Sequence, residues 1–256
     1  EKPLCITESE CIELIDTSEK NGITLMCAYP VRYWPAIIYL KQLVDEKKYG
    51  DVFQMSIWTE QYTRFPPSRN WGNTIAGLGG GQLFSHGCHY IDLLLWFLGE
   101  PVYGVHIGTR LGTPWLEGEG TSNIIIAFES GALGYHFGTW GARGTKNGYN
   151  FQIHCTEGML EYNHQEGKVY LYSGLVKDGA RSVENSKSPK VLWESEDVSK
   201  QTQYETRHFL NCIRNKTKPL TDGPSSLQGL RVIWELYKAE EEHRIADLRG
   251  LGLKSK

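Results

Sequence analysis

The chain has 256 residues, of which 40% are hydrophobic and 22% charged, and its formal net charge at pH 7 is −3. This composition is ordinary for a globular protein, and the negative charge argues against nucleic acid or an anionic membrane as the main partner. The longest apolar run, residues 90–98, is about half the length that spans a bilayer, and the first residues show no secretion signal. We therefore expect a cytoplasmic protein with neither a membrane nor a nucleic-acid partner.

The cysteines show no C-x-x-C pair and no spacing typical of zinc ligands. Several lie in apolar segments, so we expect reduced, buried thiols and no metal site. Cys88 lies next to His89, but sequence neighbours on a helix point in different directions, which argues against a nucleophile–base pair. The cysteines are Cys5, Cys11, Cys27, Cys88, Cys155 and Cys212.

The first 28 residues resemble one helix and one strand of an α/β layer. Thr7 and Glu10 have the spacing of a capping box, which predicts a helix that ends at Asn21-Gly22. Residues 23–28 then read as a buried strand. This part is too short to be a domain, so we expect a further segment ahead of it.

The rest of the chain predicts helices at both ends of a β-rich region. A helix starts near Pro35, a strand covers residues 51–64, and a loop rich in Pro, Asn and Gly covers residues 65–78. Further strands are predicted at 102–111, 122–128, 132–139, 151–156, 159–163 and 168–172, followed by a mobile loop at 174–189 and helices at 202–215 and 225–243. We expect an α/β (α+β) fold with a large, mostly antiparallel open sheet that helices cover on one side.

One helix carries the most informative residues. The glycines 79–81 lead into an apolar helix of about four turns, which Gly99 and Pro101 end. Ser85, His89 and Asp92 lie on one face of it. Buried polar groups need partners, and a helix that begins after glycines offers free N–H groups to a ligand, so we expect an active-site face here.

The order of these motifs resembles that of the Gfo/Idh/MocA oxidoreductases, the relatives of glucose–fructose oxidoreductase and inositol dehydrogenase. The matching motifs are Glu1-Lys2-Pro3, Tyr29-x-x-Arg32-x-x-Pro35, the glycines 79–81 followed by His89-x-x-Asp92, and the terminal helix with Leu227, Leu230, Val232 and Ile233. The resemblance extends over essentially the whole chain.

The resemblance implies a domain that binds NAD or NADP followed by a domain built on a large sheet. Residues 1–29 would be the end of the dinucleotide-binding (Rossmann) domain, and residues 30–256 the substrate and oligomerisation domain. The phosphate-binding G-x-G-x-x-G is not found in this chain, because residues 77–82 lack the final glycine and follow a loop.

The resemblance also implies roles for individual residues. Lys2 would hydrogen-bond the substrate hydroxyl beside the nicotinamide, and His89 would act as the base. Glu1, Pro3 and Arg32 would contribute to the cofactor site. The family's usual aspartate, four residues before the histidine, is replaced by Ser85.

We expect substrate contacts from Ser85, His86, Asp92 and Trp71. Each candidate also has an ordinary structural explanation: His89 as a core histidine, Lys2 as a solvated lysine, and Asp92 as a hydrogen-bond acceptor that orients the helix. His86 is predicted either to line the pocket or to face solvent, and Trp71, Trp115 and Trp140 either to stack on a sugar or to pack.

The resulting hypothesis is an NAD(P)-dependent oxidoreductase that acts on a sugar, a polyol or a related hydroxy compound. The alternative is a non-catalytic ligand-binding or assembly module of the same fold. We also expect a homo-oligomer formed through the open sheet face. The residues expected on that face are either Ile124, Ile126 and Phe128 or Leu133, Tyr135 and Phe137.

Overall fold

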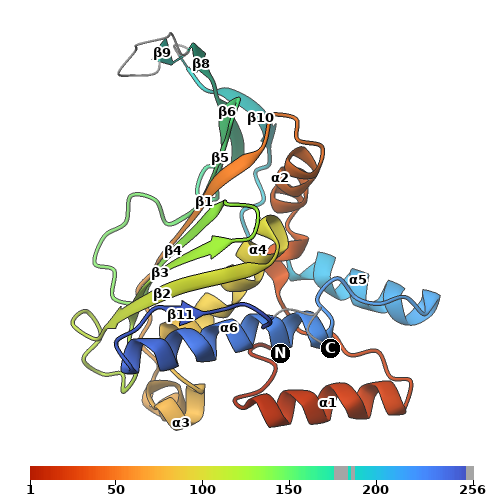
Figure 1. Cartoon of the computed structure of the whole chain (residues 1–256), viewed down its shortest axis with the longest axis vertical. Helices are drawn as coiled ribbons and strands as arrows, with labels where there is room; N and C mark the ends of the chain where they lie inside the picture. The colour runs from red at the N-terminus through yellow and green to blue at the C-terminus, as the bar shows by residue number, and fades with distance from the viewer. Residues whose placement is uncertain (176–183, 186–187, 252–256) are drawn as a thin grey trace.

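One large sheet with helices on one side dominates the computed structural model of the chain (Figure 1). The structure describes residues 1–175, 184–185 and 188–251. Its helices are α1 (Glu8–Lys20), η1 (Pro30–Tyr33), α2 (Pro35–Asp45), η2 (Pro67–Asn73), α3 (Ile75–Leu78), η3 (Leu83–Gly87), α4 (Cys88–Leu98), α5 (Thr202–Asn215) and α6 (Gly223–Glu241). Its strands are β1 (Val52–Glu60), β2 (Pro101–Thr109), β3 (Thr121–Phe128), β4 (Leu133–Thr139), β5 (Tyr149–Cys155), β6 (Gly158–Asn163), β7 (Lys168–Tyr172), β8 (Gly174–Leu175), β9 (Glu184–Asn185), β10 (Lys190–Glu194) and β11 (Ala246–Asp247).

The main sheet has nine strands in the order β10-β7-β6-β5-β1-β4-β3-β2-β11. The predicted fold class is confirmed, since every neighbouring pair except β1–β4 is antiparallel. From β2 to β4 and from β5 to β7, strands that follow one another in the sequence are neighbours in the sheet. Strand β1 lies in the middle of the sheet between β5 and β4, with Ile57 opposite His136 in a parallel ladder.

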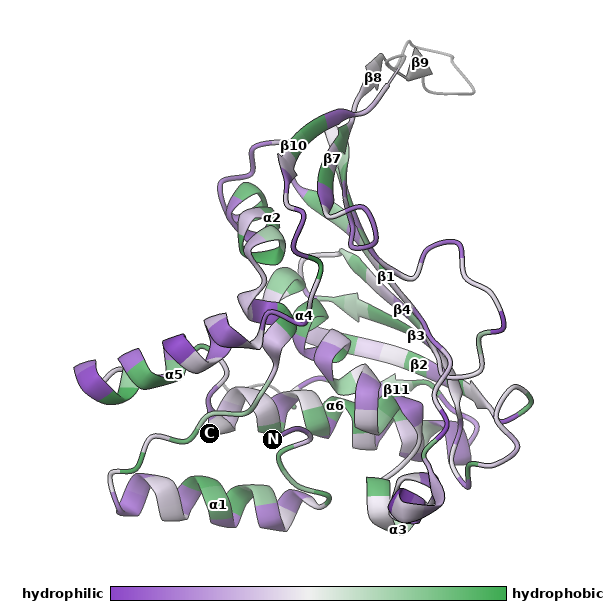
Figure 2. Ribbon diagram, turned by 180° about the vertical axis from the view of Figure 1, so that it is seen from behind, coloured by the Kyte–Doolittle hydropathy of each residue, from purple (hydrophilic) through white to green (hydrophobic). Residues whose placement is uncertain are grey.

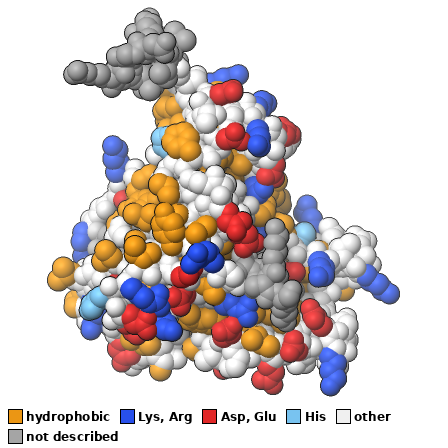
Figure 3. Space-filling view, in the orientation of Figure 1, with side chains coloured by type: hydrophobic (Ala, Val, Ile, Leu, Met, Phe, Trp, Pro, Cys, Tyr) orange, Lys and Arg blue, Asp and Glu red, His pale blue; other side chains and the backbone are white. Residues whose placement is uncertain are grey.

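The two faces of the sheet differ in their surroundings. Helices α2, α4 and α6 pack on one face, where Ile124 and Ile126 are fully buried. Ile125, between them, points to the other face and is 48% exposed. Two sets of residues were predicted for the open face. The first set is wrong, because the side chains of Ile124, Ile126 and Phe128 form the core under the helices. Leu133 of the other set is 43% exposed, and Figure 3 shows hydrophobic side chains gathered over β1, β4 and β3.

The N-terminal helix forms as predicted. The Thr7 hydroxyl accepts a hydrogen bond from the Glu10 N–H, and the Glu10 carboxylate accepts one from the Thr7 N–H. The strand predicted for residues 23–28 is wrong. The segment forms one isolated bridge, Met26 with Asp222, and Ile23 is 63% exposed. No described strand lies alongside to supply a ladder of hydrogen bonds.

The remaining expectations concern the loop, the thiols and membranes. Of the predicted loop at 174–189, residues 176–183 and 186–187 lie outside the described residues, and β8 pairs with β9 in the remainder. All of the cysteines are free thiols, as predicted, and all but the half-buried Cys5 are buried. None of the described helices is both long and apolar enough to cross a membrane.

Figure 2 shows the hydropathy of the elements from behind, with green, apolar residues in α4 and in the strands that it covers. This arrangement predicts different effects for neighbouring substitutions. Ile124→Ala should lower the free energy of unfolding by about 2–5 kcal/mol, because it leaves a cavity in a core that cannot collapse around it. Ile125→Ala should change it by about 0.5 kcal/mol or less. Urea denaturation measures both, and equal losses would show that the two faces have been assigned wrongly.

Candidate active site

A cavity of about 670 Å³ lies where the N-terminal segment, α4, β5, β6 and the start of α5 meet. Ligand sites of this size bury most of a small molecule. Its lining holds more titratable side chains than any other cavity described here. These are Glu1, Lys2, His86, His89, Tyr90, Tyr149, His164, Lys200 and Glu205.

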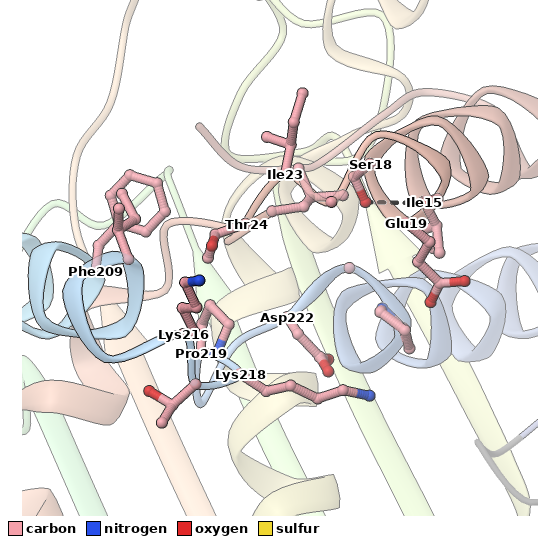
Figure 4. A pocket seen from close by; sticks show the side chains of 16 residues that line it. Ile15, Ser18, Glu19, Ile23, Thr24, Phe209, Lys216, Lys218, Pro219 and Asp222 are labelled. Atoms are coloured by element: carbon pink, nitrogen blue, oxygen red, sulfur yellow. Dashed lines mark hydrogen bonds between the residues drawn. The ribbon is translucent and has the colours of Figure 1, made fainter.

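A second cavity, of about 740 Å³, lies between α1 and the turn that joins α5 to α6 (Figure 4). Its described lining contains no histidine, cysteine or tyrosine. Lys216 and Lys218 are exposed to solvent, and Ile23 lies above them on the opposite wall. Although it is the larger cavity, its carboxylates are the exposed Glu19 and Asp222, which caps α6, so the first cavity is the candidate active site.

His89 lies on the first turns of α4 and is 8% exposed. Burial and the nearby Lys2 ammonium hold the pKa of the imidazole well below its usual value, so the ring is neutral at pH 7. Its Nδ1 is sealed from solvent, and neither ring nitrogen has a hydrogen-bond partner among the described residues. The ring packs edge-on against Tyr29, with centroids 5.5 Å apart.

Lys2 reaches the same cavity from the N-terminal segment. Its Nζ donates a hydrogen bond to the backbone carbonyl of Ser85, and its charge is close enough to act on both His86 and His89. The two residues for which the sequence predicts a catalytic role thus lie in one cavity, although 87 positions separate them in the printed sequence. Their roles themselves remain a proposal.

The helix that carries His86 and His89 begins differently from the prediction. Residues Leu83–Gly87 form a π-helical turn, η3, and regular α-helix starts only at Cys88. Such turns are frequent at functional sites because they shift side chains around the helix axis. His86 consequently lines the cavity together with His89, their ring centroids 5.9 Å apart. Ser85 is buried outside the lining and makes no side-chain bond to His89 among the described residues.

His86 is held by a chain of polar contacts. Gln82 Nε2 lies 3.3 Å from its Nδ1, and the Tyr149 hydroxyl lies 3.3 Å from its Nε2. The same hydroxyl donates to Gln61 Oε1 at 2.5 Å. With the Gln82 amide donating, Nδ1 is the acceptor and Nε2 carries the proton. Burial and Lys2 lower the pKa of this imidazole too, so it stays neutral.

Arg32 and Asp92 lie against each other instead of on the cavity wall. The Arg32 guanidinium donates to both carboxylate oxygens, at 2.5 and 2.7 Å, and to the carbonyl of Leu220 at 3.1 Å. Burial raises the pKa of Asp92, and the guanidinium opposes that shift. Neither residue lines the cavity, so the predicted substrate contact of Asp92 and cofactor contact of Arg32 have no support from their positions. The pair ties η1 to α4, and removal of one partner from such a buried pair typically costs about 3–5 kcal/mol.

The glycine run makes a close approach to an internal carboxylate. Glu119 accepts a hydrogen bond from Leu83 N–H at 2.9 Å and one from the Tyr237 hydroxyl at 2.7 Å. That hydroxyl accepts from the N–H groups of Gly81 at 3.2 Å and Phe84 at 3.1 Å. The prediction that these N–H groups are free for a ligand is wrong, because the protein's own Glu119 and Tyr237 occupy them.

The structure also places the remaining candidates. Glu1 lines the cavity, whereas Pro3 does not. Trp71 is 56% exposed on η2 and contacts Phe65, away from the cavity. Trp115 and Trp140 belong to a separate apolar cluster with Leu78 and Leu116.

Several residues that line the cavity were not predicted from the sequence. Trp34 and His164 stack face to face in the cavity wall, with centroids 4.6 Å apart and planes 11° from parallel. Gln61 and Lys200 come from loops, Tyr149 from β5 and Glu205 from the first turn of α5, and none of these segments carries a motif. Only the fold brings them together.

Comparisons with known proteins find relatives in one family. Residues 37–161 match the family model for the GFO/IDH/MocA C-terminal domain. The chain is 27% identical to levoglucosan dehydrogenase of Pseudarthrobacter phenanthrenivorans over 64% of its length, and 21% identical to D-apiose dehydrogenase of Paraburkholderia graminis over 98%. It spans 48% and 66% of those two proteins.

Solved structures share the fold. A levoglucosan dehydrogenase in complex with NADH and levoglucosan superposes with a TM-score of 0.80 at 19% identity, covering 96% of this chain and 72% of that one. The aldose-aldose oxidoreductase of Caulobacter crescentus, in complex with glycerol, gives 0.78 at 23% identity, covering 96% and 70%.

The close approach at the glycine run makes a specific prediction. A Cβ at Gly81 would lie 2.0 Å from Glu119 Oε2, so Gly81→Ala must displace the carboxylate that holds this turn. We expect a loss of about 1–3 kcal/mol in the free energy of unfolding. Gly229→Ala is the control, because no atom outside its own stretch of helix lies within 4 Å of its added Cβ and alanine favours its helix. Equal free energies of unfolding of the two variants in urea would contradict the role of Glu119 in holding this turn.

Proposed function

We propose that this chain, which belongs to the Gfo/Idh/MocA oxidoreductase family, forms the substrate side of an NAD(P)-dependent dehydrogenase for a sugar, a polyol or a related hydroxy compound. The observation that carries the proposal is the meeting of Lys2 and His89 in one cavity of ligand size. Relatives named as dehydrogenases of D-apiose, levoglucosan and D-xylose support the substrate class.

His89 would act as the general base. Oxidation of an alcohol removes the hydroxyl proton while hydride leaves the same carbon, and a hydroxyl is too weak an acid to lose its proton unaided near pH 7. A neutral imidazole accepts that proton. The Lys2 ammonium would donate a hydrogen bond to the same oxygen and stabilise the negative charge that develops on it.

The residues present fit a nicotinamide, which supplies the hydride acceptor when it is bound. Glu1 and Lys2 line a cavity large enough for a ring and a sugar, and Lys2 is held by the Ser85 carbonyl. No glycine-rich phosphate-binding turn is found in the chain. We therefore propose that the nucleotide phosphates of NAD or NADP bind to a dinucleotide-binding region that lies mostly outside this chain.

The second candidate function is a non-catalytic ligand-binding or assembly module. It shares the fold and the cavity, so only turnover separates the two. Formation of NAD(P)H from a panel of D-xylose, levoglucosan and myo-inositol by the full-length protein would favour the enzyme. Binding of one of these sugars without turnover, with either nucleotide, would favour the module.

Replacement of the proposed base should affect chemistry more than binding. We expect His89→Asn in the full-length protein to lower kcat about 10²–10⁴-fold with little change in nucleotide affinity. His243→Asn is the control, since His243 is exposed and its left-handed backbone (φ 54°) suits asparagine. Turnover near the wild-type value in His89→Asn would rule out this base.

The pH profile gives a second readout of the same residue. Because the pKa of His89 is lowered, the base stays deprotonated as the pH falls through 6.5, and kcat of the wild type should decline only at more acidic pH. A decline centred at the ordinary histidine pKa of about 6.5 or above would contradict a buried base beside Lys2.

We further propose that the open sheet face forms a homo-oligomer. Tyr103, Ile107 and Ile125 are 54%, 68% and 48% exposed on neighbouring strands, and apolar surface of this kind usually marks an interface. Light scattering should give a mass above that of one chain, and Ile125→Lys should reduce it, whereas Ile23→Lys, at an exposed isoleucine away from the sheet, should not. A monomeric wild type at high concentration would contradict this.

A further inference from the structure

The first turns of α5 bring a buried carboxyl into the active-site cavity. Glu205 lines the cavity with Lys200, Thr202 and Thr206, yet only 8% of Glu205 is exposed. Its Oε2 is sealed from solvent and has no hydrogen-bond partner among the described residues. Most buried polar atoms in native proteins are paired, so an unpaired carboxyl oxygen in a ligand-sized cavity calls for a ligand or a proton.

The surroundings of Glu205 keep this carboxyl poised between its two protonation states. Burial and the nearby Glu1 carboxylate raise its pKa to about 7. The groups that line the cavity with it from other elements are Lys2, His86, His89, Tyr149, His164 and Lys200, and Tyr33 faces it from η1. No ion pair joins Glu205 to either lysine in the described part of the chain.

The charges around the cavity indicate what kind of ligand it accepts. At neutral pH the lining carries the ammonium groups of Lys2 and Lys200 and the carboxyl groups of Glu1 and Glu205, while burial lowers the pKa of the lining histidines and keeps them neutral. Groups of both signs line the cavity, which favours an uncharged ligand, since a sugar acid would face Glu1 and Glu205 and an amino sugar would face Lys2 and Lys200.

We propose that the Glu205 carboxyl binds a second hydroxyl of an uncharged sugar or polyol, separate from the hydroxyl that His89 deprotonates. This assignment rests on the dehydrogenase function proposed above and names its substrate class. The hydroxyl donates to the carboxylate, and Glu205 acts in binding and specificity, with no part in the hydride or proton transfer. A carboxylate accepts more strongly than a carboxylic acid, so the substrate should bind more tightly as the pH rises through 7.

The test uses Glu205→Gln in the full-length protein, because this variant keeps the shape of the side chain and removes its titration. With the neutral sugar that the wild type oxidises, we expect KM to rise about 5–100-fold with little change in kcat. The fall in KM of the wild type between pH 6 and pH 8 should disappear in the variant. Glu13→Gln, at an exposed carboxyl on α1, is the matched control and should behave as the wild type.

A structural role alone would not move the pH dependence of KM. Unchanged KM at every pH in Glu205→Gln would overturn the assignment, and so would faster oxidation of D-glucuronate or D-glucosamine than of neutral sugars by the wild type. If the wild type oxidises none of these compounds, the dehydrogenase proposal fails. Calorimetric titration of D-xylose, levoglucosan and myo-inositol then tests Glu205 by binding alone. Binding that is weaker in Glu205→Gln than in the wild type and in Glu13→Gln supports its role. Equal binding in all of these proteins, or no binding to the wild type, overturns it.

Discussion

The structure of the site depends on a carboxylate that takes the place of an external anion at the start of a helix. Glu119 and Tyr237 together accept hydrogen bonds from the backbone of Gly81, Leu83 and Phe84. A helix start in this position ordinarily leaves its N–H groups to solvent or a ligand. Here Glu119 comes from the loop before β3 and Tyr237 from α6, so the glycine run is fixed to that loop and to α6. Side chains at the glycines would prevent that contact.

This anchoring decides where the two pocket histidines lie. The anchored turn continues as the π-helical η3, and the shift it introduces brings His86 onto the same wall as His89. The buried pair of Arg32 and Asp92 holds the next turn of α4 against η1. Two sets of polar contacts outside the cavity lining thus set the geometry of the residues proposed to bind the ligand. Both follow the rule that buried charges are kept where they are paired.

Local signals in the sequence were enough for several elements. The capping box of α1 and the bounds of α5 follow from residues within a few positions, and the structure reproduces them. The strand predicted at residues 23–28 failed because a strand needs a neighbour, which periodicity does not reveal. The central place of β1 in the sheet, between β5 and β4, likewise depends on tertiary contacts that local sequence does not reveal.

The candidate site was predictable only where a motif marks it. Lys2 and His89 belong to motifs, and the structure places both in the cavity. Asp92 and Arg32 belong to motifs too, but the fold pairs them with each other. Tyr149, His164 and Glu205 carry no local signal at all, since strand pairing and the position of α5 alone bring them to the cavity. Only the three-dimensional arrangement shows that these residues line the cavity.

We propose that His89 meets the substrate as a neutral imidazole in the cavity that it shares with Lys2. Histidine-selective NMR of the full-length protein, with reduced nucleotide and the sugar it oxidises, tests this most directly. We expect His89 to show the chemical shifts of a neutral ring at pH 7, and we expect the sugar to perturb His89 but not His243. A protonated His89 at pH 7, or a sugar that leaves the His89 resonances unchanged, would rule out this role.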